Sequence, residues 1–596
     1  MTNSQIADVL DQVADLLEFQ GANPFRVRAY RNAARVIREL GEPVTAILDD
    51  GQRKLTDLEA IGKDLAEKIA TLVDTGELPQ LNELLQQVPQ SVLALMRIPG
   101  LGPKRAAALH KQLGVNSLPE LKAACEAGRV RALKGFGEKT EQAILQGIHL
   151  AASAQQRLYW SEADAIAVPL REHLLACRSI HQLELAGSYR RGKDTVGDLD
   201  VLVVSSDPAS VMDRFQAFPS VAEVIARGAT KMSVRTEKGF QIDLRVVPGE
   251  SFGAALQYFT GSKEHNVVLR GLARQRGLKV NEYGVFRLRD DGQEEYLAGA
   301  SEEEVYGALD LPVFPPELRE ARHEFEWAEK GELPKLVELA DLRGDLHVHT
   351  DETDGRNSLA EMAEAARKRG LKYLAVTDHS RRVSMARGLD PPRLLKQWAD
   401  IDRLNARLEG DLLILKGIEC DILEKGGLDL PDDVLAQADW VNASVHYGQK
   451  QSRQQITQRI LEAVENPYVT AIAHPTGRLL GHREPYEVDM DAVFRAAAEH
   501  HTLLELNANP MRLDLDDLHC AIAKKHGVLI VVSTDAHSAE GLGDLRYGVL
   551  QAKRGGLTKR DVANTRTWPQ LKKLVARKRQ AVSQAAATDV RRAGRR

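Results

Sequence analysis

The sequence is poor in cysteine, with four in 596 residues and no two of them in a C-x-x-C pair. This argues against a disulfide-stapled secreted fold and against a thiolate zinc site. The sequence also lacks any apolar run that approaches the roughly 18–20 residues needed to span a bilayer. Its opening residues, MTNSQIADVL, do not form a secretory signal. We therefore expect a cytoplasmic protein that makes no use of a membrane.

An excess of positive charge is also missing, because the formal net charge is −5 at pH 7. A chain with this balance binds nucleic acid, if it does so, through local patches or backbone amides rather than through a global field. The length exceeds what one hydrophobic core supports and predicts roughly three to five domains.

A short pattern recurs three times in the first 150 residues, which are predicted to be helical, at 58–73, 96–114 and 133–147. Each copy has an apolar residue, a glycine turn, a basic residue and an amphipathic helix. A glycine turn before a helix leaves backbone N–H groups available for a phosphate. One copy would be an ordinary helix–turn–helix, but three resemble helix-hairpin-helix motifs that hold the DNA backbone without reading sequence. The candidate DNA-binding residues are Gly62, Gly100, Gly102, Lys104, Gly135, Gly137 and Lys139.

Residues 156–250 are predicted to be mixed α/β and carry paired carboxylates. In GDLDVLVV, Asp198 and Asp200 are two positions apart on a strand, so both face the same side. Asp243 lies on a second strand-like run that could pair alongside. Three carboxylates can hold two magnesium ions about 3.5–4 Å apart, and the upstream GSYRRG offers a hydroxyl and arginines to a triphosphate. A lone D-x-D is more often a solvated strand end, but this combination indicates nucleotidyl transfer.

From GSYRRG to NEYGVF the chain resembles the catalytic region of family X DNA polymerases, the polymerase beta group. The resemblance implies that Asp198, Asp200 and Asp243 bind Mg²⁺ or Mn²⁺ and that Asp243 assists deprotonation of the primer 3′-hydroxyl. The residues that it implies for the incoming triphosphate, its sugar and the nascent base pair are Ser188, Arg191, Gly197, Tyr258, Phe259, Gly261, Asn266 and Arg270.

Two positions depart from the family pattern. Val196 stands where the animal enzymes carry a serine that touches phosphate, and Gln241 replaces an arginine beside the third aspartate. Neither change removes a metal ligand, and both predict an active but slower site.

The N-terminal segment resembles the small lyase domain of the same family. Lys68 matches the lysine that forms a Schiff base with an abasic sugar, and Tyr30 matches a neighbouring site residue. A lysine in that role needs a lowered pKa, but Asp64 stands where the family has a phosphate-binding lysine. The sequence leaves two interpretations of Lys68 equally open: a catalytic nucleophile or a solvated surface lysine. Four arginines on one helix face could form a solvated surface, but their spacing slightly favours a patch for a 5′-phosphate or the DNA backbone: Arg28, Arg31, Arg35 and Arg38.

From about residue 338 apolar strands alternate with helical stretches, and seven such units predict a barrel with its site at the strand C-terminal ends. His347 and His349 have the i, i+2 spacing that puts both imidazoles on one side of a strand, and Asp535 and His537 repeat it. Nearly every strand end supplies a ligand-type side chain. Nitrogen and oxygen ligands without thiolates suit Mn²⁺ or Zn²⁺. The candidate ligands are His347, His349, Asp354, His379, Glu419, His446, His474, Asp535 and His537.

This ligand set resembles that of the PHP domain (polymerase and histidinol phosphatase), a distorted (β/α)7 barrel with a three-metal site. The resemblance implies a 3′–5′ exonuclease or 3′-end processing activity. Three arginines near the ligands are either phosphate clamps or solvated surface: Arg381, Arg382 and Arg478.

The domain order as a whole resembles the bacterial and archaeal family X DNA polymerases that carry a C-terminal PHP domain, and predicts a multidomain α+β and α/β protein. The expected domains are a lyase-like domain with the first hairpin (1–85), a helix-hairpin-helix domain (86–155), a nucleotidyltransferase palm (156–250), a subdomain for the nascent base pair (251–315), a linker (316–337), the PHP barrel (338–572) and a basic tail (573–596).

The resemblance implies an enzyme that fills short gaps in DNA repair, with gapped or nicked DNA and dNTPs as partners. The sequence leaves the oligomeric state open, and a monomer is the default expectation. Three alternatives stay open. The first is a PHP phosphatase with a DNA-anchoring front half that does not polymerise. The second is a repair scaffold without catalysis, and the third is a transferase that acts on RNA or a small molecule.

Overall fold

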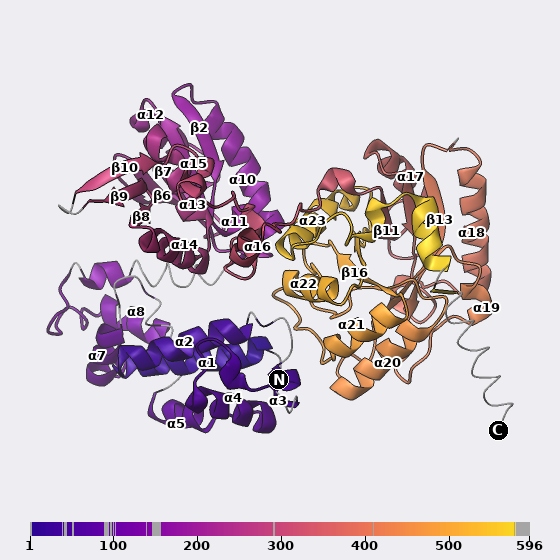
Figure 1. Ribbon diagram of the computed structural model, residues 1–596, viewed down its shortest axis with the longest axis horizontal. Coiled ribbons are helices and arrows are strands. Elements are labelled where there is room, and N and C mark those ends of the chain that lie inside the picture. Colours follow the sequence, from indigo (N-terminus) through magenta and orange to yellow (C-terminus); the bar gives the residue numbers. More distant parts are fainter. Residues whose placement is uncertain are drawn as a thin grey trace. The chain divides into compact units, whose positions relative to one another are not determined.

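The computed structural model describes residues 3–38, 40, 44–49, 53–88, 95, 98, 101, 103–138, 140–145, 157–289, 293–408, 410–576 and 578–579 (Figure 1). The chain divides into two compact units, Met1–Arg157 with Lys238–Phe240, and Leu158–Glu237 with Gln241–Arg596. Within the described residues, no helix is long and apolar enough to cross a membrane.

The first unit is helical. Its helices are α1 (Asn3–Phe19), α2 (Pro24–Arg38), α3 (Val44–Asp49), α4 (Lys63–Thr75), α5 (Pro79–Gln87), α7 (Pro103–Leu113) and α8 (Leu118–Glu126). Each longer helix turns an apolar stripe inward, so that Leu10, Ile37 and Leu109 share one core with Ile69. This packing fits the predicted helical N-terminal region.

The palm is built on a five-stranded sheet with strand order β2-β4-β7-β6-β5. The strands are β2 (Ile180–Leu185), β4 (Asp198–Ser205), β5 (Val221–Arg227), β6 (Lys231–Thr236) and β7 (Gln241–Val246). A small pair, β1 (Leu158–Tyr159) and β3 (Thr195–Val196), lies apart from it. The helices α10 (Trp160–Leu175), α11 (Gly187–Arg190) and α12 (Pro208–Gln216) complete the palm.

The register of the sheet positions the three aspartates. Strands β4 and β7 run parallel, with Asp200 opposite Asp243 and Asp198 opposite Gln241. Successive residues of a strand point to opposite faces, so the alternation in DLDVLVV buries Leu199 and Val201 and turns the aspartates to the other face. The predicted pairing of the two runs is confirmed.

The next subdomain has a three-stranded antiparallel sheet of order β10-β9-β8. Its elements are α13 (Phe252–Thr260), α14 (Lys263–Gln275), β8 (Leu278–Asn281), β9 (Gly284–Leu288), β10 (Glu294–Ala298) and α15 (Glu302–Gly307). Tyr306, Phe314 and Leu269 form its core, and α16 (Glu324–Lys330) follows in the chain.

The C-terminal part is a seven-stranded parallel sheet whose spatial order, β11 to β17, equals its sequence order. The strands are β11 (Gly344–Val348), β12 (Tyr373–Val376), β13 (Leu413–Asp421), β14 (Trp440–Ser444), β15 (Ala471–Ile472), β16 (Leu503–Asn507) and β17 (Ile530–Ser533). The helices between and after them are α17 (Leu359–Lys368), α18 (Pro391–Asn405), α19 (Asp432–Leu435), α20 (Arg453–Glu465), α21 (Met490–Glu499), α22 (Asp517–Lys525) and α23 (Leu545–Arg554).

The first and last strands meet, which makes the sheet a nearly closed barrel. Val348 bridges to Ala536 beyond the end of β17, and His349 donates from its backbone N–H to the Ala536 carbonyl at 2.9 Å. On the same seam, buried Asn564 donates to the carbonyls of Gly344 and Val532, both at 2.8 Å. Helices surround this sheet (Figure 1). The predicted barrel of seven strand–helix units is confirmed.

Candidate active sites

The three palm carboxylates lie side by side on the neighbouring strands β4 and β7, but they differ in solvent exposure and in their hydrogen-bond partners. Asp198 is exposed and Asp200 is partly buried; burial and the charges of Asp198 and Asp243 raise the pKa of Asp200 to about 7. Asp243 accepts hydrogen bonds from Ser233 and, at 3.0 Å, from Gln241. A cation would relieve the repulsion that disfavours the charged form of Asp200.

These three carboxylates are less compact than the barrel ligands. Among the described residues, the barrel contains groups of ligand atoms that all lie within 4.8 Å of one another. The three palm aspartates do not form such a group. The hydrogen bonds from Ser233 and Gln241 already occupy oxygens of Asp243. Strand pairing alone therefore brings the three side chains to one edge without converging them.

A tight turn that follows β2 brings backbone up to Asp200. Gly187 has a φ of +65°, and a Cβ at this position would lie 2.7 Å from Asp200 Oδ2, so the close approach requires glycine. Ser188 and Gly197 are both partly exposed beside it. Val196 is fully buried and packs into the core where the animal enzymes have a serine.

The two arginines of the turn make internal contacts. Arg190 forms a two-point ion pair with Glu302, at 2.9 and 2.8 Å, and donates to Thr260 Oγ1. Arg191 donates to Glu320 at 3.1 Å and to the Thr260 carbonyl at 2.7 Å. Arg191 therefore has to exchange these partners before it can meet a triphosphate.

The segment expected beside the nucleotide sugar is tied to α14. Asn266 donates to the Tyr258 carbonyl at 2.7 Å and accepts from Gln257 at 2.9 Å. A Cβ on Gly261 would lie 2.7 Å from Asn266 Oδ1. Phe259 lies under the guanidinium of Arg245, and Arg270 is exposed on α14 and donates to the Asn266 carbonyl. Asn266 thus shapes the turn in addition to any contact with DNA.

The hairpin residues are described only in part. Gly62 precedes α4 as its N-cap, and Gly135 and Gly137 lie in the third glycine turn. Gly100, Gly102 and Lys139 lie outside the described residues, and the side chain of Lys104 is not described either.

Lys68 forms an ion pair with an acidic residue and, within the described part of the chain, does not lie among basic side chains that would lower its pKa. Its Nζ lies 2.6 Å from Asp64 Oδ2 and 5.6 Å from the centre of the Tyr30 ring. Although partial burial opposes it, hydrogen bonding to Asp64 and Tyr30 raises the pKa of Lys68. A raised pKa keeps the amine protonated, which opposes the nucleophilic role.

Two arginines of the predicted basic face are paired with acids of α1. Arg31 contacts Asp11 at 3.3 Å and also pairs with Asp15, and Arg38 lies 2.8 Å from Asp8. These ion pairs favour a solvated, internally neutralised face over a phosphate patch.

The barrel brings all nine candidate ligands to the carboxyl ends of its strands. Three compact groups form there: His349 with Asp354, His379 and His537; His347 with His349 and Asp535; and His379 with Glu419 and His446. His474 joins them through Glu419, its Nε2 lying 3.0 Å from Glu419 Oε1.

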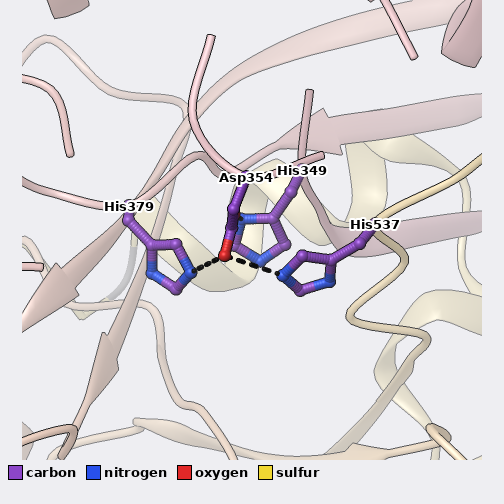
Figure 2. Close-up of side chains that lie close together, drawn as sticks. All are labelled: His349, Asp354, His379 and His537. Atoms are coloured by element: carbon purple, nitrogen blue, oxygen red, sulfur yellow. Dashed lines mark ion pairs between the residues drawn. The ribbon is translucent and has the colours of Figure 1, made fainter. Parts of the chain in front are cut away.

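Figure 2 shows the first of these groups. Asp354 lies between two imidazoles, with its Oδ2 3.4 Å from His379 Nε2 and 3.3 Å from His537 Nε2. The His349 ring lies behind the same carboxylate. One carboxylate among several imidazoles is an arrangement that can bridge two divalent cations.

The donor atoms fit a metal cluster. Five of them are buried and have no hydrogen-bond partner: His347 Nε2, His349 Nδ1, His379 Nδ1, Glu419 Oε2 and His474 Nδ1. Buried polar atoms are rarely left unpaired, and coordination would satisfy them. Burial, together with the neighbouring His537 and His379, lowers the pKa of His349 to about 3, so its imidazole is neutral and able to ligate.

Two carboxylates that the sequence analysis did not single out orient these ligands. Glu505 accepts from, or shares a proton with, His347 Nδ1 at 2.7 Å, and Asp421 lies 3.0 Å from His446 Nδ1. Each contact directs the other ring nitrogen toward the cluster. The signal was present in the sequence, because Asp421 follows Glu419 by two positions on one strand and Glu505 precedes Asn507 by two.

The proposed phosphate clamps differ from one another. Arg382 pairs with Glu424 and packs on the Tyr447 ring, 4.4 Å from its centre. Arg478 donates to the carbonyls of Arg512 and Leu513, so it supports the loop rather than a phosphate. Arg381 is exposed.

Comparison with known families agrees with this architecture. The chain matches the DNA polymerase beta palm over residues 157–240, the DNA polymerase beta thumb over 255–320 and the PHP domain over 345–510. Helix-hairpin-helix families match 1–78 and 92–149. Fold and families together define a class, a polymerase beta-type core joined to a PHP barrel.

Individual relatives narrow this class. A protein named DNA polymerase/3′-5′ exonuclease PolX from Bacillus subtilis (strain 168) is 40% identical over 569 residues, 95% of this chain and 98% of the relative. The chain belongs to the family X DNA polymerases that carry a C-terminal PHP domain. DNA polymerase lambda of Rattus norvegicus is 26% identical over 53% of this chain and 56% of its own length. A probable phosphatase of Thermoanaerobacter sp. (strain X514) is 32% identical over 37% of this chain and 89% of its own length.

Proposed function

We propose that this chain extends DNA primers across short gaps at the palm and trims 3′ ends at the barrel by 3′–5′ exonuclease action. The observation that supports it most is the presence of two separate acid-containing groups, one on the β4–β7 edge and one at the barrel mouth, in a chain of this family. Gapped or nicked DNA and dNTPs are the proposed partners, and a monomer in the cytoplasm is the proposed state of the chain.

At the palm, Asp198, Asp200 and Asp243 would hold Mg²⁺ or Mn²⁺. Metal ions there would stabilise both the attacking and the leaving oxygen of an in-line displacement. Asp243 would take the proton of the primer 3′-hydroxyl. Ser188 and Gly197 would meet the triphosphate with Arg191, and a triphosphate offers Arg191 an anion in place of Glu320.

The remaining palm assignments follow the chain order of the family. Tyr258, Phe259 and Gly261 would contact the sugar of the incoming nucleotide. Asn266 and Arg270 would reach the minor groove of the nascent pair. The hairpin glycines and their lysines would bind DNA phosphates through backbone N–H groups and charge, within the domain boundaries predicted from the sequence.

At the barrel, the nine candidate ligands would hold Mn²⁺ or Zn²⁺. Such ions would polarise a scissile phosphate and lower the pKa of water for attack on it. The chain's own residues orient the imidazoles through Glu505 and Asp421 and keep His349 neutral by burial.

A phosphatase is the second candidate for the barrel. Three relatives named probable phosphatases match 35–37% of this chain over 85–89% of their own length. The match to a polymerase/exonuclease over 95% of this chain does not favour that alternative. As a phosphatase, the barrel would release phosphate from free monoesters, and the front half would only anchor DNA.

The test uses a 5′-labelled primer in a short-gapped duplex with Mn²⁺, with and without dNTPs. Wild type, Asp198→Ala/Asp200→Ala and His347→Ala/His349→Ala are compared. We expect the first variant to lose extension and keep shortening, and the second to do the reverse. If wild type neither extends nor shortens the primer but hydrolyses free phosphomonoesters, the phosphatase replaces this proposal. Incorporation of rNTPs in preference to dNTPs would favour the alternative of a transferase that acts on RNA or a small molecule.

A further inference from the structure

An arginine of the β16–α22 loop lies against the barrel ligands. Arg512 Nε is 3.4 Å from Asp535 Oδ2, and the Arg512 side chain is 18% exposed. The opposite oxygen of that carboxylate faces the imidazoles, with Oδ1 3.0 Å from His349 Nε2. Asp535 thus separates a guanidinium from the group of candidate metal ligands.

The backbone around Arg512 is anchored on both sides. Its N–H donates to the Asn509 carbonyl at 2.8 Å, and its carbonyl accepts from Arg478 Nε at 2.9 Å. The preceding carbonyl, of Met511, accepts from the Leu480 N–H at 2.8 Å. A side chain that starts from a loop held in this way is presented to the site at a defined position.

The guanidinium is not fully satisfied by these contacts. Its Nη1 is buried and has no hydrogen-bond partner, and a desolvated donor without an acceptor is costly. Asp535 Oδ2, which Arg512 Nε contacts, is shared with a second donor, because it also accepts from Asn507 Nδ2 at 3.1 Å. An acceptor that reached the site from solvent would stabilise Arg512.

A second guanidinium adds to the positive charge. Arg483 donates to the Gly477 carbonyl at 2.9 Å, and burial together with the charge of Arg512 lowers its pKa. Of the two, Arg512 contacts the ligand group through Asp535, and its planar guanidinium suits an anion with several oxygens.

We propose that Arg512 binds the scissile phosphate of the 3′-terminal nucleotide, with Nη1 donating to a non-bridging oxygen. The inference rests on the proposed nuclease function and names the residue that contacts substrate there. In the hydrolysis, a water oxygen bonds to phosphorus, the bond from phosphorus to the preceding 3′-oxygen breaks, and that oxygen takes up a proton. The guanidinium stabilises the negative charge that builds on the phosphate oxygens.

The experiment uses the full chain loaded with Mn²⁺ and compares wild type with Arg512→Ala, Arg512→Lys and a control, Arg495→Ala. Arg495 is exposed on α21 and pairs with Asp491. Three quantities are measured: kcat/KM for shortening a 5′-labelled single strand, the Kd of dTMP by equilibrium dialysis, and the manganese content of the desalted protein.

We expect Arg512→Ala to lower kcat/KM by about 100-fold, as loss of one charge-stabilising donor does. The dTMP Kd should rise at least about tenfold, since hydrogen bonds to charged groups contribute about 1.5–3 kcal/mol. Manganese content should stay equal to wild type. Arg512→Lys should recover only part of the dTMP affinity, because lysine keeps the positive charge but lacks the planar pair of donors of arginine. Arg495→Ala should behave as wild type.

Two results would overturn the inference. The first is wild-type kcat/KM and dTMP affinity in Arg512→Ala. The second is a loss of manganese that accounts for the whole loss of activity, with dTMP affinity per loaded site unchanged, which would make Arg512 a positioning residue for Asp535. If wild type shortens no primer, the nuclease proposal has failed, and dTMP binding still decides for or against Arg512.

Discussion

At the scale of single residues, the barrel site depends on carboxylates that need not touch a metal. Glu505 and Asp421 each contact the Nδ1 of a histidine whose Nε2 lies within 3.4 Å of Glu419. These contacts fix the orientation and the tautomer of each ring before a metal binds, so less side-chain rearrangement is needed on binding. Lys68 is the contrasting case, because its contacts with Asp64 and Tyr30 stabilise the charged amine.

Glu505→Ala should weaken metal binding at the barrel by about 10–100-fold, the usual effect of removing the partner of a ligating histidine. The reason is that the His347 ring loses its anchor at Nδ1. Competition of Mn²⁺ with a chelating dye measures this. Glu499→Ala, at an exposed position on α21, is the control, and equal affinities in the two variants would contradict the prediction.

Asp64→Asn should increase Schiff-base formation at Lys68 several-fold. Removal of the acid lowers the pKa of the amine, so that more of it is unprotonated near neutral pH. Borohydride trapping on abasic-site DNA between pH 7 and pH 9 measures the adduct, and Lys68→Met shows which part belongs to this lysine. Trapping that is unchanged in Asp64→Asn would mean that Asp64 does not restrain the lysine.

At the scale of elements, ion pairs join the turn of α11 to the segments that follow the palm. Glu302, at the start of α15, is paired with Arg190 of α11 and with fully buried Arg319. Although burial alone would raise it, these arginines lower the pKa of Glu302 to about 2. These pairs therefore couple the α11 turn to the neighbouring subdomain.

Glu302→Gln should reduce the free energy of unfolding by about 3 kcal/mol at pH 7, because two guanidinium groups lose their buried anion. A folded-state pKa of about 2, below the usual 4.5, means that the carboxylate contributes stability above pH 4.5 and loses it as the pH falls toward 2. Urea unfolding at pH 7, 5.5 and 4 should show a wild-type–variant difference that is constant above pH 4.5 and smaller at pH 4. A difference that grows on acidification would refute the argument.

At the scale of the whole molecule, the palm and the barrel share one buried ionic network. Arg554 of α23 lies 2.9 Å from Glu320 Oε1 and 2.6 Å from Asp517 Oδ2, and it donates to the Arg191 carbonyl at 2.9 Å. Arg554 and Arg191 thus share Glu320. The contacts of the turn around Arg191 depend in this way on a helix of the barrel.

Arg554→Ala should lower the stability of the second compact unit by about 3–5 kcal/mol, since two buried acids lose a common cation. Calorimetry should show a lower unfolding temperature and a separation of the palm and barrel transitions. Lys559→Ala, which removes a largely exposed pair with Asp341, should change the stability by less than about 1 kcal/mol. Equal shifts in both variants would show that the network does not stabilise the contact.

The sequence by itself determined the element order, the seven-stranded barrel and the nine ligand-type residues at its strand ends. It could do so because strand alternation and i, i+2 spacing are local, and parallel strands bring their carboxyl ends to one rim. The same reasoning placed Asp200 and Asp243 on neighbouring strands.

Only the tertiary structure decided which side chains engage one another across long separations. It pairs Glu505 with His347, Arg191 with Glu320, and Arg31 with acids of α1, and it leaves the palm aspartates less converged than the barrel ligands. Partners of this kind depend on strand order, loop anchoring and burial, which set side-chain distances between residues far apart in the chain. The ion-pair partner of a charged residue therefore cannot be read from the sequence alone, because it depends on the folded distances.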